Sequence, residues 1–217
     1  MNLGALFDWD GVIIDSSAQH EESWERLADE IGKPLPDDHF VRGFGMKNQV
    51  IIPTILDWTD DPDEIERYSL RKEALYRDIV RRDGIRPLPG VRDLLQRLAD
   101  QGVPCSVASS THRENIETIF EATDLGPFFS AVVTAEDVSH GKPDPEVFLT
   151  SASRIGRDPA RCVVFEDAHV GIEAGLAAGC RVIAVATTNP IDELGQAHLA
   201  VRSLDEVDWN RVRDLFE

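Results

Sequence analysis

The chain has 217 residues, of which 42% are hydrophobic and 29% are charged. This composition is typical of a globular protein with one large core, or with a core and a small second domain, and it excludes a disordered chain. Its 40 acidic and 22 basic residues give a net charge of −18, which repels a polyanion and argues against a nucleic-acid partner.

The distribution of apolar and basic residues indicates neither a membrane-spanning segment nor a secretion signal. No run approaches the roughly 18 apolar residues that span a bilayer, and the first residues lack a basic region followed by an apolar one. We therefore expect a cytoplasmic protein without a membrane partner, either a monomer or a small homo-oligomer. Three widely spaced cysteines in strand-like surroundings are predicted to be buried free thiols: Cys105, Cys162 and Cys180.

The first apolar segment, over 5–7, ends at two aspartates that are one residue apart. Asp8 and Asp10 would point to the same side of a strand, because side chains alternate along it. Gly11 follows them and lets the backbone turn closely, with its N–H groups available to a bound anion. An ordinary polar turn with two solvated aspartates would have the same local sequence.

A long interval without strands comes next. Helical periodicity predicts helices over 21–31, 49–56 and 62–82. We therefore expect a core domain of residues 1–15 and 86–217, with a helical cap domain of residues 16–85 inserted into it. The hinges would lie near 15–17 and 87–90.

Beyond the insert, apolar strands alternate with helical segments. The predicted strands are 105–108, 131–134, 162–165 and 181–185, and the predicted helices are 91–100, 113–122, 145–154 and 170–178. This alternation predicts an α/β fold, a doubly wound and mostly parallel sheet that is covered by helices on both faces.

Three further polar groups are predicted to lie at strand ends or just before helices. Ser109 and Ser110 offer a hydroxyl and N–H groups to phosphate, and Lys142 lies between a glycine and a proline. Glu166 and Asp167 form an acidic pair whose mutual repulsion calls for a cation. Each group alone is equally typical of a helix cap or a solvated turn. Open α/β sheets, however, bind their ligands at the carboxyl ends of the strands.

Taken in this order, the groups at Asp8-x-Asp10, Ser109, Lys142 and Glu166-Asp167 resemble the four motifs of the haloacid dehalogenase superfamily. The resemblance covers essentially the whole chain. The insert is similar to the helical cap of the subfamily that contains β-phosphoglucomutase and phosphoglycolate phosphatase. The resemblance implies a Rossmann-like core with that cap, and Mg²⁺-dependent phosphoryl transfer.

The same resemblance implies a role for each motif residue. Asp8 would attack phosphorus and form an aspartyl-phosphate, while Asp10 would act as general acid and then as general base. Lys142 would stabilise the nucleophile and the transferring phosphoryl group. The implied phosphate-binding groups are Lys142, the Ser109 hydroxyl and the N–H groups of Trp9, Gly11 and Ser110. The implied Mg²⁺ ligands are Asp8, the Asp10 carbonyl, Asp167, and Glu166 either directly or through water.

The second aspartate of the first motif favours a phosphoester substrate. Dehalogenases lack it, because a halide leaves without a proton. We therefore expect a phosphatase of a small phosphorylated metabolite, of the sugar phosphate or phosphoglycolate type. His20, Lys47 and Lys72 are expected to contact the substrate from the cap, although each could equally be a solvated residue on a helix surface.

Two other functions fit less well. A hexose phosphate mutase of the β-phosphoglucomutase type would have an arginine for the second phosphate where this chain has Met46, and Lys47 one residue later cannot reproduce bidentate arginine geometry. A receiver domain of a response regulator also combines a phosphorylated aspartate with a lysine and an acidic pair. Its acidic pair comes first in the chain, however, and it has no helical insert.

Overall fold

The computed structural model describes residues 2–43 and 46–217, and the chain divides into two compact units. The core unit comprises Met1–Asp15 and Ile85–Glu217, and the insert unit comprises Ser16–Gly84. The structural boundary at residue 85 lies one residue before the predicted one.

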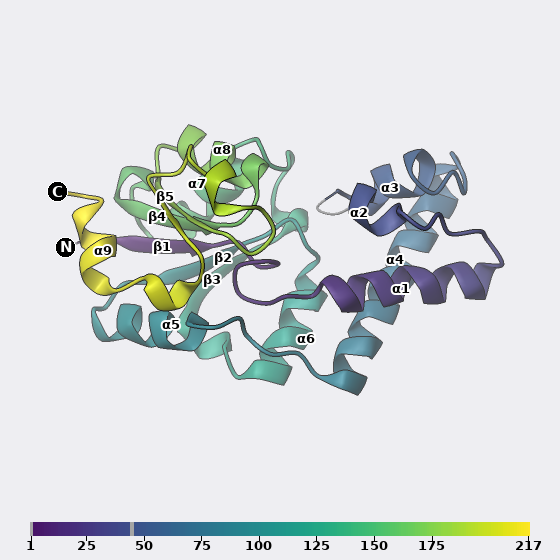
Figure 1. Ribbon diagram of the computed structural model, residues 1–217, viewed down its shortest axis with the longest axis horizontal. Helices are drawn as coiled ribbons and strands as arrows, with labels where there is room; N and C mark the ends of the chain where they lie inside the picture. The colour runs from purple at the N-terminus through teal and green to yellow at the C-terminus, as the bar shows by residue number, and fades with distance from the viewer. Residues whose placement is uncertain (1, 44–45) are drawn as a thin grey trace. The chain divides into compact units, whose positions relative to one another are not determined.

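A six-stranded parallel sheet forms the centre of the core unit, in the order β3-β2-β1-β4-β5-β6 (Figure 1). Its strands are β1 (Gly4–Phe7), β2 (Cys105–Ala108), β3 (Phe129–Val133), β4 (Cys162–Glu166), β5 (Arg181–Val185) and β6 (Leu199–Val201). The predicted doubly wound parallel fold is confirmed. Strand β6 was not predicted, because it has only three residues and the first two are partly exposed.

Helices cover both faces of this sheet. Figure 1 shows α7 and α8 on one side of it and α5 and α6 on the other. The helices of the core unit are α5 (Val91–Asp100), α6 (Arg113–Thr123), α7 (Glu146–Arg154), α8 (His169–Ala177) and α9 (Trp209–Asp214). The first four were predicted to within one residue at each end, whereas the short α9 was not predicted.

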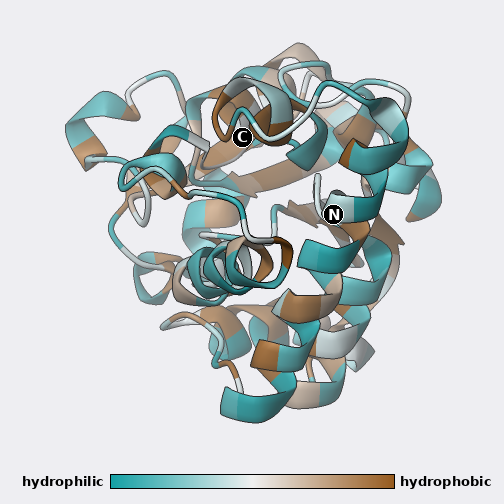
Figure 2. Cartoon of the chain, turned by 90° about the vertical axis from the view of Figure 1, so that its right-hand side faces the viewer, coloured by the Kyte–Doolittle hydropathy of each residue, from teal (hydrophilic) through white to brown (hydrophobic). Residues whose placement is uncertain are grey.

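Apolar side chains from the strands and helices fill the space between these layers, and much of the sheet is brown in Figure 2. Phe7 stacks on Phe165 with ring centroids 4.5 Å apart, and the Trp9 ring meets Phe120 edge-on at 5.4 Å. Contacts of this kind add to the hydrophobic burial that stabilises the unit. The prediction for the cysteines is also confirmed, since all three are buried free thiols.

The insert unit is helical and has a hydrophobic core of its own. Its helices are α1 (Ser17–Ile31), α2 (His39–Gly43), α3 (Asn48–Thr54) and α4 (Pro62–Asp83). Pro62 opens α4, and the Asp61 carboxylate accepts the N–H groups of Asp63 and Glu64, which stabilises the start of the helix. The rings of Trp24 and Trp58 lie 5.9 Å apart in the core of the unit.

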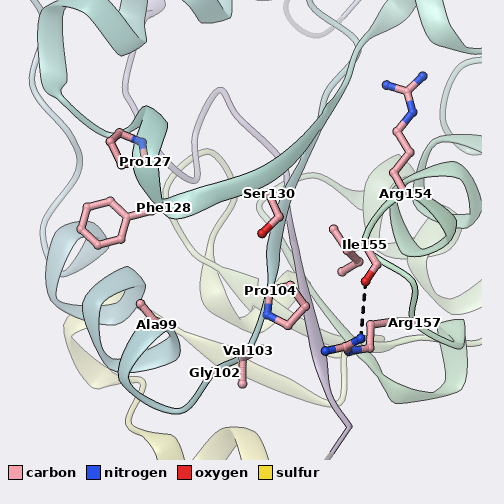
Figure 3. Close-up of a pocket in the computed structure, with 10 residues that line it drawn as sticks. All are labelled: Ala99, Gly102, Val103, Pro104, Pro127, Phe128, Ser130, Arg154, Ile155 and Arg157. Carbon is pink, nitrogen blue, oxygen red and sulfur yellow. Dashed lines mark hydrogen bonds between the residues drawn. The ribbon is translucent and has the colours of Figure 1, made fainter.

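No helix in the described ranges is long and apolar enough to cross a membrane. A surface pocket of about 510 Å³ lies at the edge of the core unit where the strands begin, and Figure 3 shows it. The Arg157 side chain, which lines this pocket, donates to the carbonyl oxygens of Leu3 and Gly156 at 2.9 and 3.1 Å. The motif residues follow the strands instead, so they lie at the opposite edge of the sheet.

Candidate active site

The carboxyl edge of the sheet brings the first and fourth motifs together. Strand β1 lies between β2 and β4, with Phe7 in register with Val107 and Phe165. The Asp8 N–H donates to the Phe165 carbonyl at 2.9 Å, so Asp8 continues the ladder by one residue beyond β1. The residues that follow these three strands therefore meet at one place, although they are far apart in the sequence.

Lys142 joins two of the acidic residues. Its Nζ donates to Asp8 Oδ1 and to Glu166 Oε1, both at 2.6 Å, and its side chain is only 8% exposed. Burial alone would lower the pKa of Lys142, but the carboxylates of Asp8 and Glu166 outweigh that effect and raise the pKa above its ordinary value. Lys142 is therefore held as a cation against Asp8.

Three buried carboxylates surround this lysine. Asp8, Glu166 and Asp167 each offer an oxygen atom, and these atoms lie within 4.8 Å of one another. Burial raises the pKa of Asp8 well above its ordinary value, and burial together with repulsion from Glu166 raises the pKa of Asp167 to about 7. When all three carboxylates are ionised, one ammonium leaves two negative charges uncompensated, and the raised pKa values of Asp8 and Asp167 reflect the cost of that excess. A doubly negative set of oxygen donors fits a hard divalent cation such as Mg²⁺.

Glu166 differs from the other two acids because protein donors already bind both of its oxygens. Oε1 accepts from Lys142, and Oε2 accepts from the N–H groups of Asp167 and Ala168 at 2.7 and 2.8 Å. Gly171 makes room for this carboxylate, since a Cβ at that position would overlap Oε1. Glu166 thus orients Lys142, and its Oε1 accepts only one of these bonds, so direct or water-mediated binding to a metal remains a prediction.

The turn after β1 places Asp10 and Gly11 near the fourth motif. Asp10 is half-buried, and its charge is among the causes, after burial and Glu166, that raise the pKa of Asp167. Gly11 has a φ of +81°, and a Cβ there would overlap the Asp167 carboxylate. The Gly11 N–H donates to the Ile14 carbonyl at 2.7 Å and closes the turn, and its expected phosphate-binding role remains a prediction.

Ser109 is buried directly after β2. Its N–H donates to the Val133 carbonyl at 3.0 Å, and its Oγ accepts the Thr111 N–H at 3.1 Å. Because Oγ is the acceptor in that bond, the hydroxyl can still donate its proton to a phosphate oxygen. Ser110 beside it is exposed, whereas the Trp9 side chain is buried in the aromatic core. Phosphate binding by the N–H groups of Ser110 and Trp9 remains a prediction.

Comparison with known proteins agrees with this geometry. The family model of the haloacid dehalogenase-like hydrolases matches residues 4–179. The chain belongs to this family. The predicted resemblance to the haloacid dehalogenase superfamily is therefore confirmed.

Two relatives show how far the similarity to other haloacid dehalogenase-like hydrolases extends. The chain is 37% identical to the chloroplastic 5-amino-6-(5-phospho-D-ribitylamino)uracil phosphatase of Arabidopsis thaliana, over 98% of the chain but only 58% of that protein. It is 31% identical to the validoxylamine A 7'-phosphate phosphatase of Streptomyces hygroscopicus subsp. limoneus, over 96% of the chain and 97% of that protein. The chain thus spans little more than half of the first relative and nearly all of the second.

A solved structure of a family IA haloacid dehalogenase hydrolase from Entamoeba histolytica has the same fold. It superposes with a TM-score of 0.89 and 28% identity, and the match covers 99% of each chain. The parallel sheet and the helical insert are therefore both present in a solved member of the family.

Two further polar residues of this haloacid dehalogenase-like hydrolase lie at the site and were missed by the sequence analysis. Thr188 Oγ1 donates to Asp167 Oδ2, and Asn189 Nδ2 donates to the Asp167 carbonyl at 2.9 Å. Both residues follow β5, as the motif residues follow their own strands. Their position at a strand end was the available signal, but neither carries a charge.

In the insert unit, Lys72 and His20 form a pair. Lys72 is only 3% exposed, and its Nζ lies 2.6 Å from His20 Nδ1 and 3.0 Å from Glu73 Oε1. The His20 ring stacks on Tyr76, with ring centroids 4.1 Å apart. Lys72 is therefore not a solvated surface residue, whereas Lys47 at the start of α3 is exposed. Contact of these residues with a substrate remains a prediction.

The contact with Lys72 requires a neutral His20 ring, which makes folding sensitive to acid. Burial, and then the charge of Lys72, lower the pKa of His20 from 6.5 to about 3. The folded state therefore binds fewer protons than the unfolded state below pH 6.5, so stability falls as the pH drops from 6.5 towards 3. His20→Gln keeps an acceptor for Lys72 but cannot titrate. On acidification to pH 4.5, the wild type should lose up to roughly 2–3 kcal/mol of its free energy of unfolding through His20, and the variant should not show this loss.

Denaturant titrations at pH 7.5 and 4.5 would measure this effect. The matched control is His140→Gln, at an exposed position of the core unit. This variant should lose as much stability on acidification as the wild type. An equal loss in His20→Gln would contradict the assignment of a neutral, half-buried His20.

Proposed function

We propose that the chain is a Mg²⁺-dependent phosphatase that hydrolyses a small phosphorylated metabolite through an aspartyl-phosphate on Asp8. The observation that carries the proposal is the position of Asp8, which is held by Lys142 beside Asp167 in a buried site with two uncompensated negative charges. Both relatives described above are named as phosphatases of phosphorylated small molecules. The substrate class is accordingly a sugar phosphate or a phosphoglycolate-type ester.

The proposed metal ligands are Asp8, Asp167 and the main-chain carbonyl of Asp10. Bound Mg²⁺ would compensate the excess negative charge and polarise the phosphoryl oxygens. The Lys142 ammonium would reduce the repulsion between the Asp8 carboxylate and an approaching phosphate. Ser109 would donate its hydroxyl to a phosphate oxygen, since the Thr111 N–H already holds that side chain in place.

Catalysis would then divide between the two aspartates of the first motif. Asp8 would form the covalent phosphoryl ester, which splits a slow hydrolysis into two faster steps. Asp10 would protonate the leaving alkoxide and then remove a proton from the water that attacks the phosphorylated Asp8. The half-buried position of Asp10 supports this role, because a proton donor and acceptor must be accessible in both steps.

We propose that the insert unit is the cap domain and that His20, Lys47 and Lys72 act on the leaving group of the substrate. The contact between buried Lys72 and half-buried His20 supports different roles for the two residues. Lys72 donates to His20 Nδ1, so a neutral His20 ring carries its proton on Nε2 and can donate it to a hydroxyl. Lys72 then orients His20, and the exposed Lys47 is the cation available to an anionic group.

A hexose phosphate mutase is the second candidate, because the cap His20–Lys72 pair resembles the mutase pattern. Met46 stands where the mutase has its phosphate-binding arginine, and this residue is exposed. The two reactions differ in product, since a phosphatase releases inorganic phosphate and a mutase returns an isomeric hexose phosphate. Analysis of the products from a panel of sugar phosphates, with and without a hexose bisphosphate, separates them.

The proposed mechanism predicts different defects for the two aspartates. Asp8→Asn should abolish turnover, because the nucleophile is lost. Asp10→Asn keeps the main-chain carbonyl and should lower kcat by about 10²–10⁴-fold with a metabolite ester. An aryl phosphate has a good leaving group, so phosphorylation of Asp10→Asn should stay fast while its hydrolysis is slow. Rapid-quench measurements should show a burst of aryl alcohol, and steady product formation without a burst would contradict the role of Asp10.

Metal dependence provides a separate test. Exhaustive chelation should abolish activity, Mg²⁺ should restore it, and Ca²⁺ should inhibit it. Calcium accepts more ligands at longer distances and can bind both oxygens of Asp8, which leaves neither oxygen directed at phosphorus. Phosphate release is measured for chelated enzyme with each cation added back. Equal turnover with Ca²⁺, or full activity after chelation, would contradict the metal assignment.

A further inference from the structure

We propose that Thr188 is a positioning residue for Asp167, and that it holds the carboxylate in the orientation needed to bind the metal. This inference rests on the proposed function, because it assigns a role at the proposed Mg²⁺ site. Thr188 carries no charge and belongs to none of the four motifs. Its role would make the loop after β5 a further part of the site.

The contacts around Asp167 carry the inference. Among the described residues, Thr188 is the one side chain that donates a hydrogen bond to the Asp167 carboxylate, and it does so at Oδ2. Asn189 binds the main-chain carbonyl of the same residue at 2.9 Å. Asp167 is 3% exposed. Two successive residues of one loop therefore bind both the side chain and the main chain of a buried acid.

A carboxylate needs such a partner because the terminal torsion of aspartate is broad. The other two acids of the site are held by different groups. Asp8 is bound by Lys142, and Glu166 is bound by Lys142 and by two N–H groups. Thr188 would supply the equivalent restraint at Asp167 without adding a charge that competes with the cation.

The turn after β1 also restricts the Asp167 carboxylate. A Cβ at Gly11 would overlap Asp167 Oδ2 and lie 3.0 Å from Thr188 Oγ1. The carboxylate oxygen Oδ2 thus lies beside both the bare Cα of Gly11 and the Thr188 hydroxyl. With Oδ2 held by Thr188, Asp167 Oδ1 is the oxygen left for the cation. Removing the hydroxyl would free the carboxylate to rotate away from this arrangement.

A pair of nearly isosteric variants tests the role. Thr188→Val replaces the hydroxyl by a methyl group, whereas Thr188→Ser keeps the hydroxyl and removes the methyl group. Mg²⁺ is titrated into chelator-treated protein in a calorimeter, so the measurement is independent of turnover. Partners of metal ligands typically contribute about 10–100-fold to metal affinity. We expect Thr188→Val to raise the Kd for Mg²⁺ by about that factor and Thr188→Ser to remain within about threefold of the wild type.

The melting temperature of the metal-free protein separates positioning from general structural support. Positioning predicts that Thr188→Val loses Mg²⁺ affinity while its metal-free form melts close to the wild-type temperature. A lower melting temperature with unchanged Mg²⁺ affinity would overturn the inference, as would equal affinities of Thr188→Val and the wild type. If Thr188→Val does not fold, Thr188→Ala against Thr188→Ser gives the same comparison without an added methyl group beside Asp167.

The Mg²⁺ affinity of Asp167→Asn shows whether a negative result concerns Thr188 alone or the proposed metal site. Loss of Mg²⁺ binding in Asp167→Asn, together with wild-type affinity in Thr188→Val, would overturn the role of Thr188 alone. Wild-type affinity in Asp167→Asn would show that the metal binds elsewhere. That result would contradict the proposed site together with the inference.

Discussion

The rest of the site depends on the burial of three carboxylates around one lysine. Lys142 compensates Asp8 and Glu166 at 2.6 Å, but two negative charges remain in a region that water barely reaches. Such a charge excess costs free energy unless a cation binds. This excess supports the proposed divalent cation, which would in turn allow a phosphate to approach a protein whose net charge is −18.

The parallel sheet brings these charged side chains together. Because β1 lies between β2 and β4, the ends of three central strands bring together residues more than 150 positions apart in the sequence. Glycine adapts the backbone around the acids. Gly11 leaves room for Asp167, and Gly171 leaves room for Glu166. Alanine at either position would displace a carboxylate, so these glycines belong to the site although they contribute no functional group.

The sequence predicted those helices and strands whose positions follow from the local order of apolar and polar residues. Long apolar runs and helical periodicity marked the main strands and helices, whereas β6, α2 and α9 were missed because each is too short to show a period. The burial of Lys72 depends on His20, which lies 52 residues away, and no local pattern contains that contact. Thr188 escaped notice for a similar reason, since its partner Asp167 lies on a neighbouring strand end. The hydrogen bond from the Gly11 N–H to the Ile14 carbonyl, which closes the turn after β1, was likewise not indicated by the sequence.

The most direct test of the proposed chemistry is chemical trapping of the covalent intermediate. Borohydride reduces an acyl phosphate to an alcohol, so an aspartyl-phosphate quenched during turnover becomes homoserine at the phosphorylated position. Mass spectrometry of the peptide that contains residues 4–15 then identifies that position. The account predicts homoserine at residue 8 and intact aspartate at residue 10, with the signal dependent on substrate and Mg²⁺. Conversion at Asp10, or substrate turnover without any reduced residue, would contradict it.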